Sequence, residues 1–201
     1  MLENPVPSRR RVLGAAAALG FAAFAKSALG AVVPTVDPAT AVRSALARLG
    51  ARAPHRDVAA VADFRPSSRE QRLHLVDLLS GKVDSLLVAH GRGSDPEHTG
   101  WLSRFSNVPG SDCTSEGAYL TGDYYVGEHG RSMRLAGLDP TNDNAEARGI
   151  VIHSAWYVGP DMIRTHGMLG RSEGCFAVSP ADLSMVLERL GPGRLLLATR
   201  L

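Results

Sequence analysis

Apolar residues recur at two different spacings along this chain, and the spacing changes near residue 58. From Pro38 to Leu49 they recur every three or four residues, which places them on one face of a helix. Asp37 can cap that helix, and Gly50 can end it. We therefore expect a helix over 38–49 that packs on the outside of the domain.

From residue 58 onward, short apolar runs alternate with turns that contain Gly, Pro or Asn, a pattern typical of strands. The runs 71–79 and 83–90 flank a short Gly-containing turn, which predicts a β-hairpin. Further strands are expected over 58–64, 117–125, 131–135, 149–153 and 195–199, with the last one central in the sheet. The pattern predicts a mostly β (α+β) domain with a few short peripheral helices.

Two of those short helices lie in the last third of the chain. Residues 161–166 predict one or two helical turns that Gly167 ends. A second helix is expected to begin with Ser179 as its cap and Pro180 in its first turn. Leu183 to Leu190 provide its apolar stripe.

Two polar segments interrupt the strands. The stretch 91–110 is too long for a plain connection, so it is expected to be functional or ordered by packing, with Trp101 and Phe105 as anchors. The run Asn142-Asp143-Asn144 is expected at a loop tip, because such residues favour turns.

The first thirty residues differ from the rest in composition. Arg9-Arg10-Arg11 precedes an Ala- and Gly-rich run that Lys26 interrupts well short of the ~20 apolar residues of a membrane span. Small residues at 28–30 suit cleavage, and the arginine pair followed by Val-Leu resembles a twin-arginine export signal. An ordinary secretory signal and an uncleaved anchor are the alternatives. We expect an exported protein of the periplasm or cell envelope, with a signal peptide over 1–30, a helix and linker over 31–56, and the main domain over 57–201.

Removal of that signal changes the charge of the protein. The whole chain carries +2 at pH 7 and its first thirty residues contribute +3, which leaves −1 for the rest. Nucleic-acid binding needs a basic surface, so we expect no such partner. The rest of the chain suits one domain with a hydrophobic core, without stable membrane insertion.

The candidate chemistry centres on a cysteine in a polar turn. Cys175 follows Gly174, and His153 ends an apolar run 22 positions upstream. A thiol attacks a carbonyl as its thiolate, and a neighbouring imidazole can remove the proton. His153 is therefore a candidate base, with the backbone carbonyl of Ser154 as the acceptor that orients its ring.

Other uses of these residues stay open on spacing alone. An exported protein can form disulfides, so a Cys113–Cys175 disulfide in a non-enzymatic wall-binding module is an alternative. His166 is a second candidate base, since it lies nearer to Cys175. A zinc site from His153, His166 and Cys175 matches no common ligand spacing, and we expect no metal or cofactor.

Two runs carry a more specific signal: GIVIHSAWYV at 149–158 and HGMLGRSEGCFAV at 166–178. Both resemble the murein L,D-transpeptidase catalytic domain family. The stretches 89–94, 105–111 and 142–145 also resemble that family, so the resemblance covers roughly residues 60 to 200. It implies a β-sandwich or barrel-like catalytic domain over 57–201.

The resemblance also implies an activity and its substrate. Cys175 would be the nucleophile and His153 the base of an acyl transfer on peptidoglycan stem peptides through a thioester. An amine acceptor would give an L,D-transpeptidase. Water as the acceptor would give an L,D-carboxypeptidase or endopeptidase.

The turn before the cysteine has expected roles as well. The backbone N–H groups of Gly174 and Cys175, with Glu173, can hold an oxyanion, and Ser172 can order the turn. Better-known family members have His where this chain has Glu173, which removes a side chain but keeps the backbone amide. Candidate substrate contacts are Arg171, His166 and Trp156.

Overall fold

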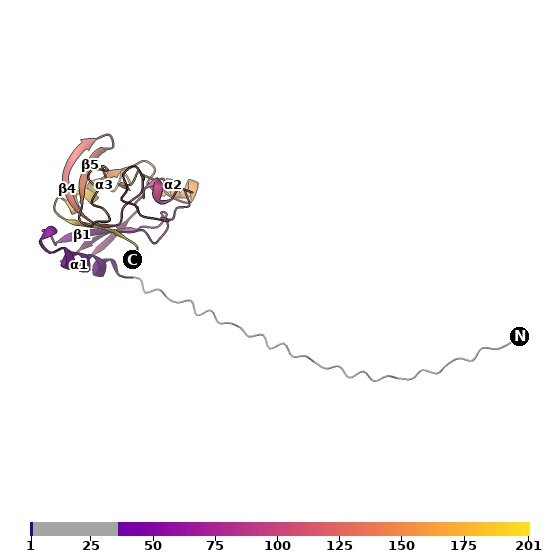
Figure 1. The fold of residues 1–201 in the computed structure, drawn as a ribbon, viewed down its shortest axis with the longest axis horizontal. Helices are drawn as coiled ribbons and strands as arrows, with labels where there is room; N and C mark the ends of the chain where they lie inside the picture. The colour runs from indigo at the N-terminus through magenta and orange to yellow at the C-terminus, as the bar shows by residue number, and fades with distance from the viewer. Residues whose placement is uncertain (2–35) are drawn as a thin grey trace. The chain divides into compact units, whose positions relative to one another are not determined.

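The computed structural model of the protein describes Met1 and residues 36–201 (Figure 1). Apart from Met1, the expected signal over 1–30 lies outside the described residues. In chain order, the elements are α1 (Pro38–Leu49), η1 (Gly50–Arg52), β1 (Val58–Asp63), β2 (Leu73–Asp77), β3 (Val83–Leu86), η2 (Arg92–Ser94), β4 (Gly117–Gly127), β5 (Gly130–Gly137), β6 (Val151–Ser154), α2 (Pro160–His166), β7 (Phe176–Val178), α3 (Leu183–Leu190) and β8 (Leu195–Thr199).

The strands form one mixed sheet of eight, in the order β3-β2-β1-β8-β4-β5-β6-β7. β1 pairs with β8 and β6 with β7 in parallel, and the other neighbours are antiparallel. Beyond the end of β3, the N–H of Ala89 donates to the carbonyl of Ala177 in β7 at 2.9 Å, so the two edges of the sheet approach each other. The predicted mostly β fold, with β8 central, is confirmed.

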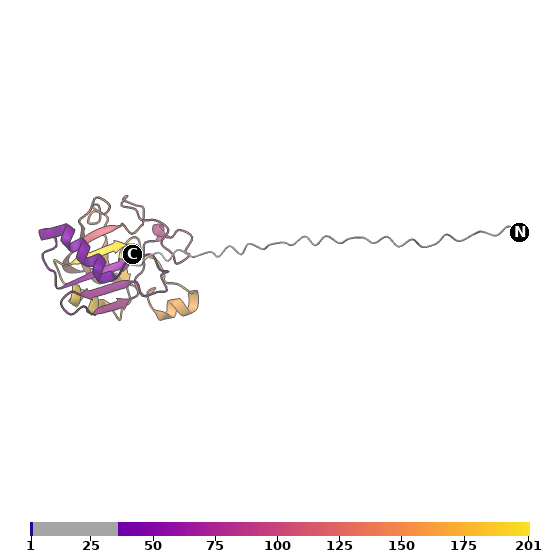
Figure 2. The same ribbon diagram turned by 90° about the horizontal axis from the view of Figure 1, so that it is seen from below.

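Both faces of the sheet are covered, because successive residues of a strand point to opposite sides. In β1, Ala59 and Val61 pack with α1, while Ala60 and Ala62 pack with α3. Figure 2 shows α1 crossing the strands on its face of the sheet. The helix begins as predicted, since the N–H of Thr40 donates to the Asp37 carboxylate at 3.0 Å. Each fully buried Val or Leu of these layers stabilises the fold by about 1.5–3 kcal/mol.

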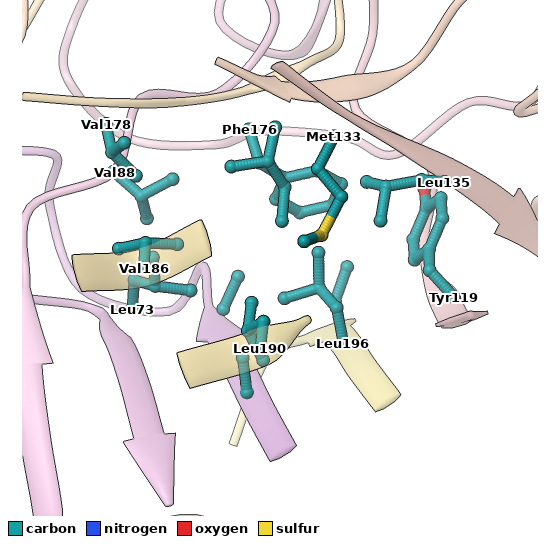
Figure 3. Close-up of a cluster of buried hydrophobic side chains, with 14 of the residues drawn as sticks. Leu73, Val88, Tyr119, Met133, Leu135, Phe176, Val178, Val186, Leu190 and Leu196 are labelled. Carbon is teal, nitrogen blue, oxygen red and sulfur yellow. The ribbon is translucent and has the colours of Figure 1, made fainter. Parts of the chain in front are cut away.

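The core between α3 and the sheet fixes the strand that follows the cysteine (Figure 3). Phe176, the first residue of β7, is 1% exposed and packs edge-on against Tyr119, with ring centroids 5.2 Å apart. Val186 and Leu190 of α3 close the same cluster. Because Phe176 points into this core, its neighbour Cys175 is directed to the other face of the sheet.

Some expectations from the sequence need correction. α3 begins at Leu183 rather than at Ser179, because Ser179 closes a separate turn in which its Oγ accepts the N–H of Asp182 at 3.1 Å. The strand β7 was missed, since three residues show no periodicity.

No helix among residues 36–201 is long and apolar enough to cross a membrane.

Two loop expectations are only partly correct. Trp101 does not anchor the stretch 91–110, because its side chain is 54% exposed, whereas Phe105 packs edge-on against Phe64. Asn142 is not at an exposed loop tip. It is fully buried, and its Nδ2 donates to the carbonyl of Ala118 at 2.8 Å, which also accepts the N–H of Leu138 at 2.8 Å.

Candidate active site

Strand register brings Cys175 and His153 to one face of the sheet. Ile152 pairs with Phe176 and His153 with Ala177 in the parallel pair β6–β7. Cys175 therefore lies beside Val151, two residues from His153 along the strand and on the same side. Both residues line one pocket of about 320 Å³.

The ring of His153 is fixed from two directions. Its Nδ1 lies 2.9 Å from the carbonyl of Ser154, the acceptor expected from the sequence, so Nδ1 carries the proton in the neutral ring and Nε2 is free to accept one. His129, at the tip of the β4–β5 hairpin, stacks on it with ring centroids 4.2 Å apart. Burial lowers the pKa of His153; the hydrogen bond to Ser154 opposes this shift, and the charge of His129 adds to it.

The thiol of Cys175 rests in its neutral form. The residue is 9% exposed, and Sγ lies 3.6 Å from the carbonyl of Gly149. Burial raises the pKa of Cys175; the backbone of Val151 and the charge of Arg148 oppose that shift, and Glu173 adds to it. A raised thiol pKa beside a lowered imidazole pKa favours the neutral pair over a thiolate–imidazolium pair at rest.

Cys113 and Cys175 are both free thiols. The alternative of a Cys113–Cys175 disulfide is therefore wrong for this structure. Cys113 is fully buried under the turn, where its carbonyl contacts the backbone near Gly174.

The turn before Cys175 is held by one serine. Ser172 Oγ donates to the carbonyl of Cys175 at 2.7 Å and accepts the N–H of Gly174 at 3.2 Å. Gly174 has φ +117°, and a Cβ there would lie 2.6 Å from the carbonyl of Cys113, so only glycine fits. Within residues 36–201, the N–H groups of Glu173 and Cys175 donate to no protein acceptor. These two amides, rather than that of Gly174, are free to receive an oxyanion.

Charged side chains surround the thiol. Arg92 pairs with Asp112 at 2.9 Å and with Glu173 at 3.1 Å. Arg171 donates to the backbone carbonyls of residues 95 and 96. The pocket is lined by Arg92, His129, Arg148, Gly149, His153, Tyr157, Arg171, Ser172, Glu173 and Cys175.

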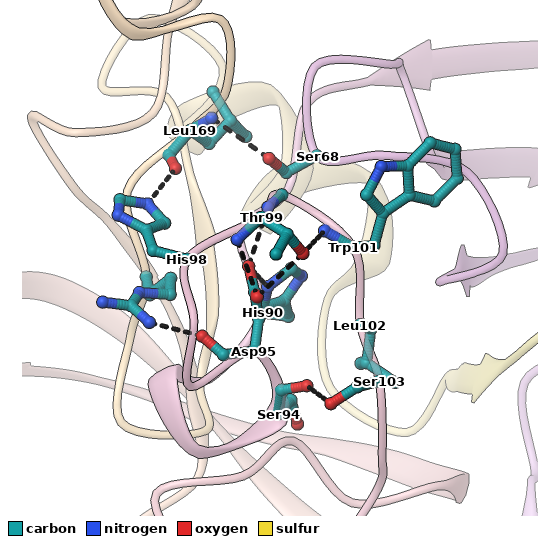
Figure 4. A network of polar contacts seen from close by, with 12 residues as sticks. Ser68, His90, Ser94, Asp95, His98, Thr99, Trp101, Leu102, Ser103 and Leu169 are labelled. Atoms are coloured by element: carbon teal, nitrogen blue, oxygen red, sulfur yellow. Dashed lines mark hydrogen bonds and ion pairs between the residues drawn. The ribbon is translucent and has the colours of Figure 1, made fainter.

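A buried polar network surrounds Asp95 and His90 (Figure 4). Asp95 is 2% exposed, and its carboxylate accepts the N–H groups of Thr99 and Gly100, each at 2.8 Å. His90 lies between Asp95 and the fully buried Arg72, whose Nη2 donates to His90 Nδ1 at 2.8 Å. Burial lowers the pKa of His90 to about 3, so this ring is neutral.

The network connects directly to the turn before Cys175 through the backbone. The N–H of Ser172 donates to the carbonyl of His90 at 2.9 Å, and the N–H of Arg92 donates to the carbonyl of Ser172 at 2.7 Å. The segment that carries His90 therefore fixes the position of the turn that carries the cysteine.

The structure separates the sequence-predicted residues into two groups. Cys175, His153, Glu173, Ser172 and Arg171 line the pocket, and the backbone of Ser154 and Gly174 adjoins it. His166 is exposed at the end of α2, and Trp156 is 81% exposed; neither lines the pocket.

Sequence reasoning missed Arg92 and Arg148, and it did not count Tyr157 and His129 among the candidate site residues. Tyr157 lines the pocket whereas its neighbour Trp156 does not, and burial raises the pKa of Tyr157 to about 12. Arg148 lies three residues before β6, and Arg92 lies between two glycines, but no spacing rule identifies either one. His129 is brought in by the hairpin tip, which local sequence does not reveal.

No group of three or more His, Cys, Asp or Glu side chains within residues 36–201 is placed to hold a metal ion. The pocket lining contains the thiol of Cys175, the imidazoles of His129 and His153, and the charged side chains described above.

Fold and pocket together define a class of protein. A thiol and an imidazole, one of whose nitrogens is free to accept a proton, share a partly enclosed pocket, and this arrangement is typical of enzymes that act through a cysteine nucleophile. The chain belongs, more specifically, to the L,D-transpeptidase catalytic domain family, whose family model matches residues 38–198.

Solved structures of similar proteins include an L,D-transpeptidase from Mycobacterium smegmatis, with 14% identity over 71% of this chain and 58% of that one, TM-score 0.43. One from Mycobacterium tuberculosis has 15% identity over 71% of this chain and 57% of that one, TM-score 0.45. The cell-shape determining protein Pgp2 of Campylobacter jejuni has 16% identity over 77% of this chain and 53% of that one, TM-score 0.44. This chain thus spans less than two thirds of the length of each. No curated protein matches the chain.

Proposed function

We propose that this protein is an L,D-transpeptidase that acts on peptidoglycan stem peptides, with Cys175 as nucleophile and His153 as base. The observation that carries the proposal is the placement of both side chains on one face of β6 and β7, in one pocket, in a chain of this family. The free Nε2 of His153 gives the thiol proton a destination.

The first half-reaction forms a thioester. The proton of the Cys175 thiol moves to His153 Nε2, and the sulfur attacks the carbonyl between an L-centre and a D-residue of the donor stem. The N–H groups of Glu173 and Cys175 receive the negative charge on the carbonyl oxygen; one such donor contributes about 2.7–4 kcal/mol to the transition state. The C–N bond then breaks, and the imidazolium gives its proton to the departing amine of the D-residue.

The second half-reaction transfers the acyl group to an amine of a neighbouring stem. His153 removes a proton from that amine, which attacks the thioester and releases the cysteine thiolate; the proton on His153 then restores the thiol. A second cavity of about 220 Å³ shares Gly149 with the thiol pocket and is lined by Asp123, Glu146 and Arg134. Two carboxylates beside one guanidinium leave a net negative charge that suits a cationic amine, which favours an amine acceptor over water.

The substrate also bears on where the protein works. Peptidoglycan lies outside the cytoplasmic membrane, so we propose that the protein is exported to the periplasm or cell envelope. The signal over 1–30, the linker segment over 31–56 and the catalytic domain over 57–201 form part of this proposal. N-terminal sequencing of the protein recovered from the envelope tests it, and a mature start near residue 31 is expected.

The direct test of the activity is product analysis. Purified protein is incubated with a labelled stem tetrapeptide, with and without a second stem that carries a free amine. We expect a cross-linked dimer and release of the terminal D-residue. Formation of tripeptide alone would indicate an L,D-carboxypeptidase, and an unchanged tetrapeptide would contradict the proposal.

A further inference from the structure

Three arginines line the pocket of Cys175, and they differ in what holds them. Arg92 pairs with two carboxylates, and Arg171 donates to two backbone carbonyls of the loop 91–103. Arg148 instead packs against the turn that carries the cysteine: a Cβ added at Gly174 would lie 3.2 Å from its Nη2.

The guanidinium of Arg148 is held by groups on two neighbouring loop segments. Its Nη1 donates to the carbonyl of Ser106 at 2.9 Å and to Ser115 Oγ at 3.3 Å. Its Nη2 donates to the carbonyl of Cys113 and, at 3.5 Å, to Ser111 Oγ. These hydrogen bonds already fix the position of the guanidinium, so it loses little conformational entropy when it stabilises an anion.

All of these partners are neutral. Within residues 36–201, no carboxylate forms an ion pair with Arg148, in contrast to Arg92. The side chain is partly buried, so solvent screens its charge less than that of an exposed arginine. A fixed cation without a counterion, directly behind the cysteine turn, is placed for an anion that forms during the reaction.

We propose that Arg148 stabilises the Cys175 thiolate and is the electrostatic residue that opposes the cost of ionising a buried thiol. The inference rests on the proposed role of Cys175 as nucleophile. Arg148 acts through space on the sulfur, and its hydrogen bonds go to the segments at 106 and 111–115, so it is a positioning residue rather than a proton carrier.

The electrostatics of the thiol agree with this geometry. Burial raises the pKa of Cys175 and Glu173 adds to the shift, whereas the charge of Arg148 lowers that pKa. Arg92 pairs with Glu173, so the arginine nearest to that carboxylate is already engaged. Arg171, like Arg148, has only carbonyl partners, but Arg148 is the one whose Nη2 lies against Gly174 and whose charge lowers the pKa of the thiol.

Arg148 also joins the loop segments near 106 and 113, so a purely structural role is the competing explanation. Three variants separate the two roles. Arg148→Gln removes the charge and keeps hydrogen-bond donors, Arg148→Lys keeps the charge, and Arg200→Gln removes an arginine that holds the carbonyl of Leu102 but does not line the pocket.

The measurement is the pH profile of iodoacetamide alkylation, read on the Cys175 peptide by mass spectrometry so that Cys113 does not contribute. An opposite charge nearby shifts a pKa by about one unit or more. We expect Arg148→Gln to move the alkylation midpoint up by about one pH unit, which lowers the thiolate fraction at neutral pH roughly tenfold. Arg148→Lys is expected to restore most of the shift, and Arg200→Gln to leave the midpoint unchanged.

Equal midpoints for Arg148→Gln and wild type, in protein with a wild-type circular dichroism spectrum, would overturn the inference. Equal shifts in the Gln and Lys variants would do the same, because geometry rather than charge would then be responsible. Alkylation needs no peptide substrate, so a shifted midpoint without turnover of stem peptides would count against the proposed function alone.

Discussion

Two polar regions adjoin the Ser172–Cys175 turn, and they differ in how their polar and charged groups are paired. In the buried network of Arg72, His90 and Asp95, every buried side-chain nitrogen and oxygen has a partner. In the pocket, Arg148 has no carboxylate, and the N–H groups of Glu173 and Cys175 have no protein acceptor in the described chain.

This difference indicates which of the two regions stabilises the fold and which can bind a ligand. A satisfied buried network rigidifies the turn and leaves nothing for a ligand, because an unpaired group there would cost about 1–3 kcal/mol. The residues that carry these groups line a cavity instead, where a substrate can bind. Changes in the network should therefore affect stability, whereas changes in the pocket should affect reactivity.

Removal of the proposed nucleophile should have the largest effect. Cys175→Ala is expected to abolish cross-linking of stem peptides completely, because no other thiol reaches the pocket. Cys113→Ala is the matched control and should retain turnover, since Cys113 lies outside the pocket lining. The assay is chromatography of the labelled products, and turnover by Cys175→Ala would exclude the mechanism.

Removal of the proposed base should have the next largest effect. We expect His153→Ala to lose about 10²–10⁴-fold in kcat/KM, the usual contribution of a general base. His166→Ala should stay near wild type, because its side chain is exposed and outside the pocket. A greater loss in His166→Ala than in His153→Ala would show that His166, and not His153, is the base.

A change in the buried network tests the other half of the comparison. Asp95→Asn places an amide against N–H donors and removes the charge that faces Arg72, so the free energy of unfolding should fall by about 3 kcal/mol. Urea denaturation measures this. Asp112→Asn removes a carboxylate from an exposed ion pair and should leave the unfolding midpoint unchanged. Equal effects of the two variants would mean that the network is no more important to the fold than a surface pair.

The smallest effect is expected from the residue that departs from the better-known family pattern. Glu173 raises the pKa of Cys175, so Glu173→Gln should lower the alkylation midpoint of the thiol by a fraction of a pH unit. In both proteins, alkylation should rise with pH, because the reactive species is the thiolate. A midpoint that moves upward would show that Glu173 acts by another route, such as the position of Arg92.

Much of the fold follows from local pattern. The helix over 38–49, the first hairpin and the central strand 195–199 have clear periodicity or turn signals, and the structure contains each of them. The parallel pair β6–β7 does not follow in the same way, because three residues carry no period and their partner lies more than twenty positions away. Asn142 was misplaced because its burial depends on a distant carbonyl rather than on its own preference for turns.

The candidate site likewise contains residues that the local sequence predicts and residues that it does not. The sequence predicts Cys175, His153 and Ser172 as site residues, because they lie in the two short runs 149–158 and 166–178. Arg148, His129 and Tyr157 enter the pocket through loop and hairpin packing. The stack of His129 on His153 depends on the hairpin length, which no local signal encodes.

The central claim is that Cys175 carries the acyl group, and one measurement tests it directly. The protein is mixed with a stem tetrapeptide without an acceptor amine, quenched in acid, and its mass is determined intact and after digestion. The account predicts a mass increase equal to the tripeptide acyl group, located on the Cys175 peptide and released by hydroxylamine. An unmodified Cys175 in folded protein whose thiol still reacts with iodoacetamide, or an acyl group on any other residue, would contradict it.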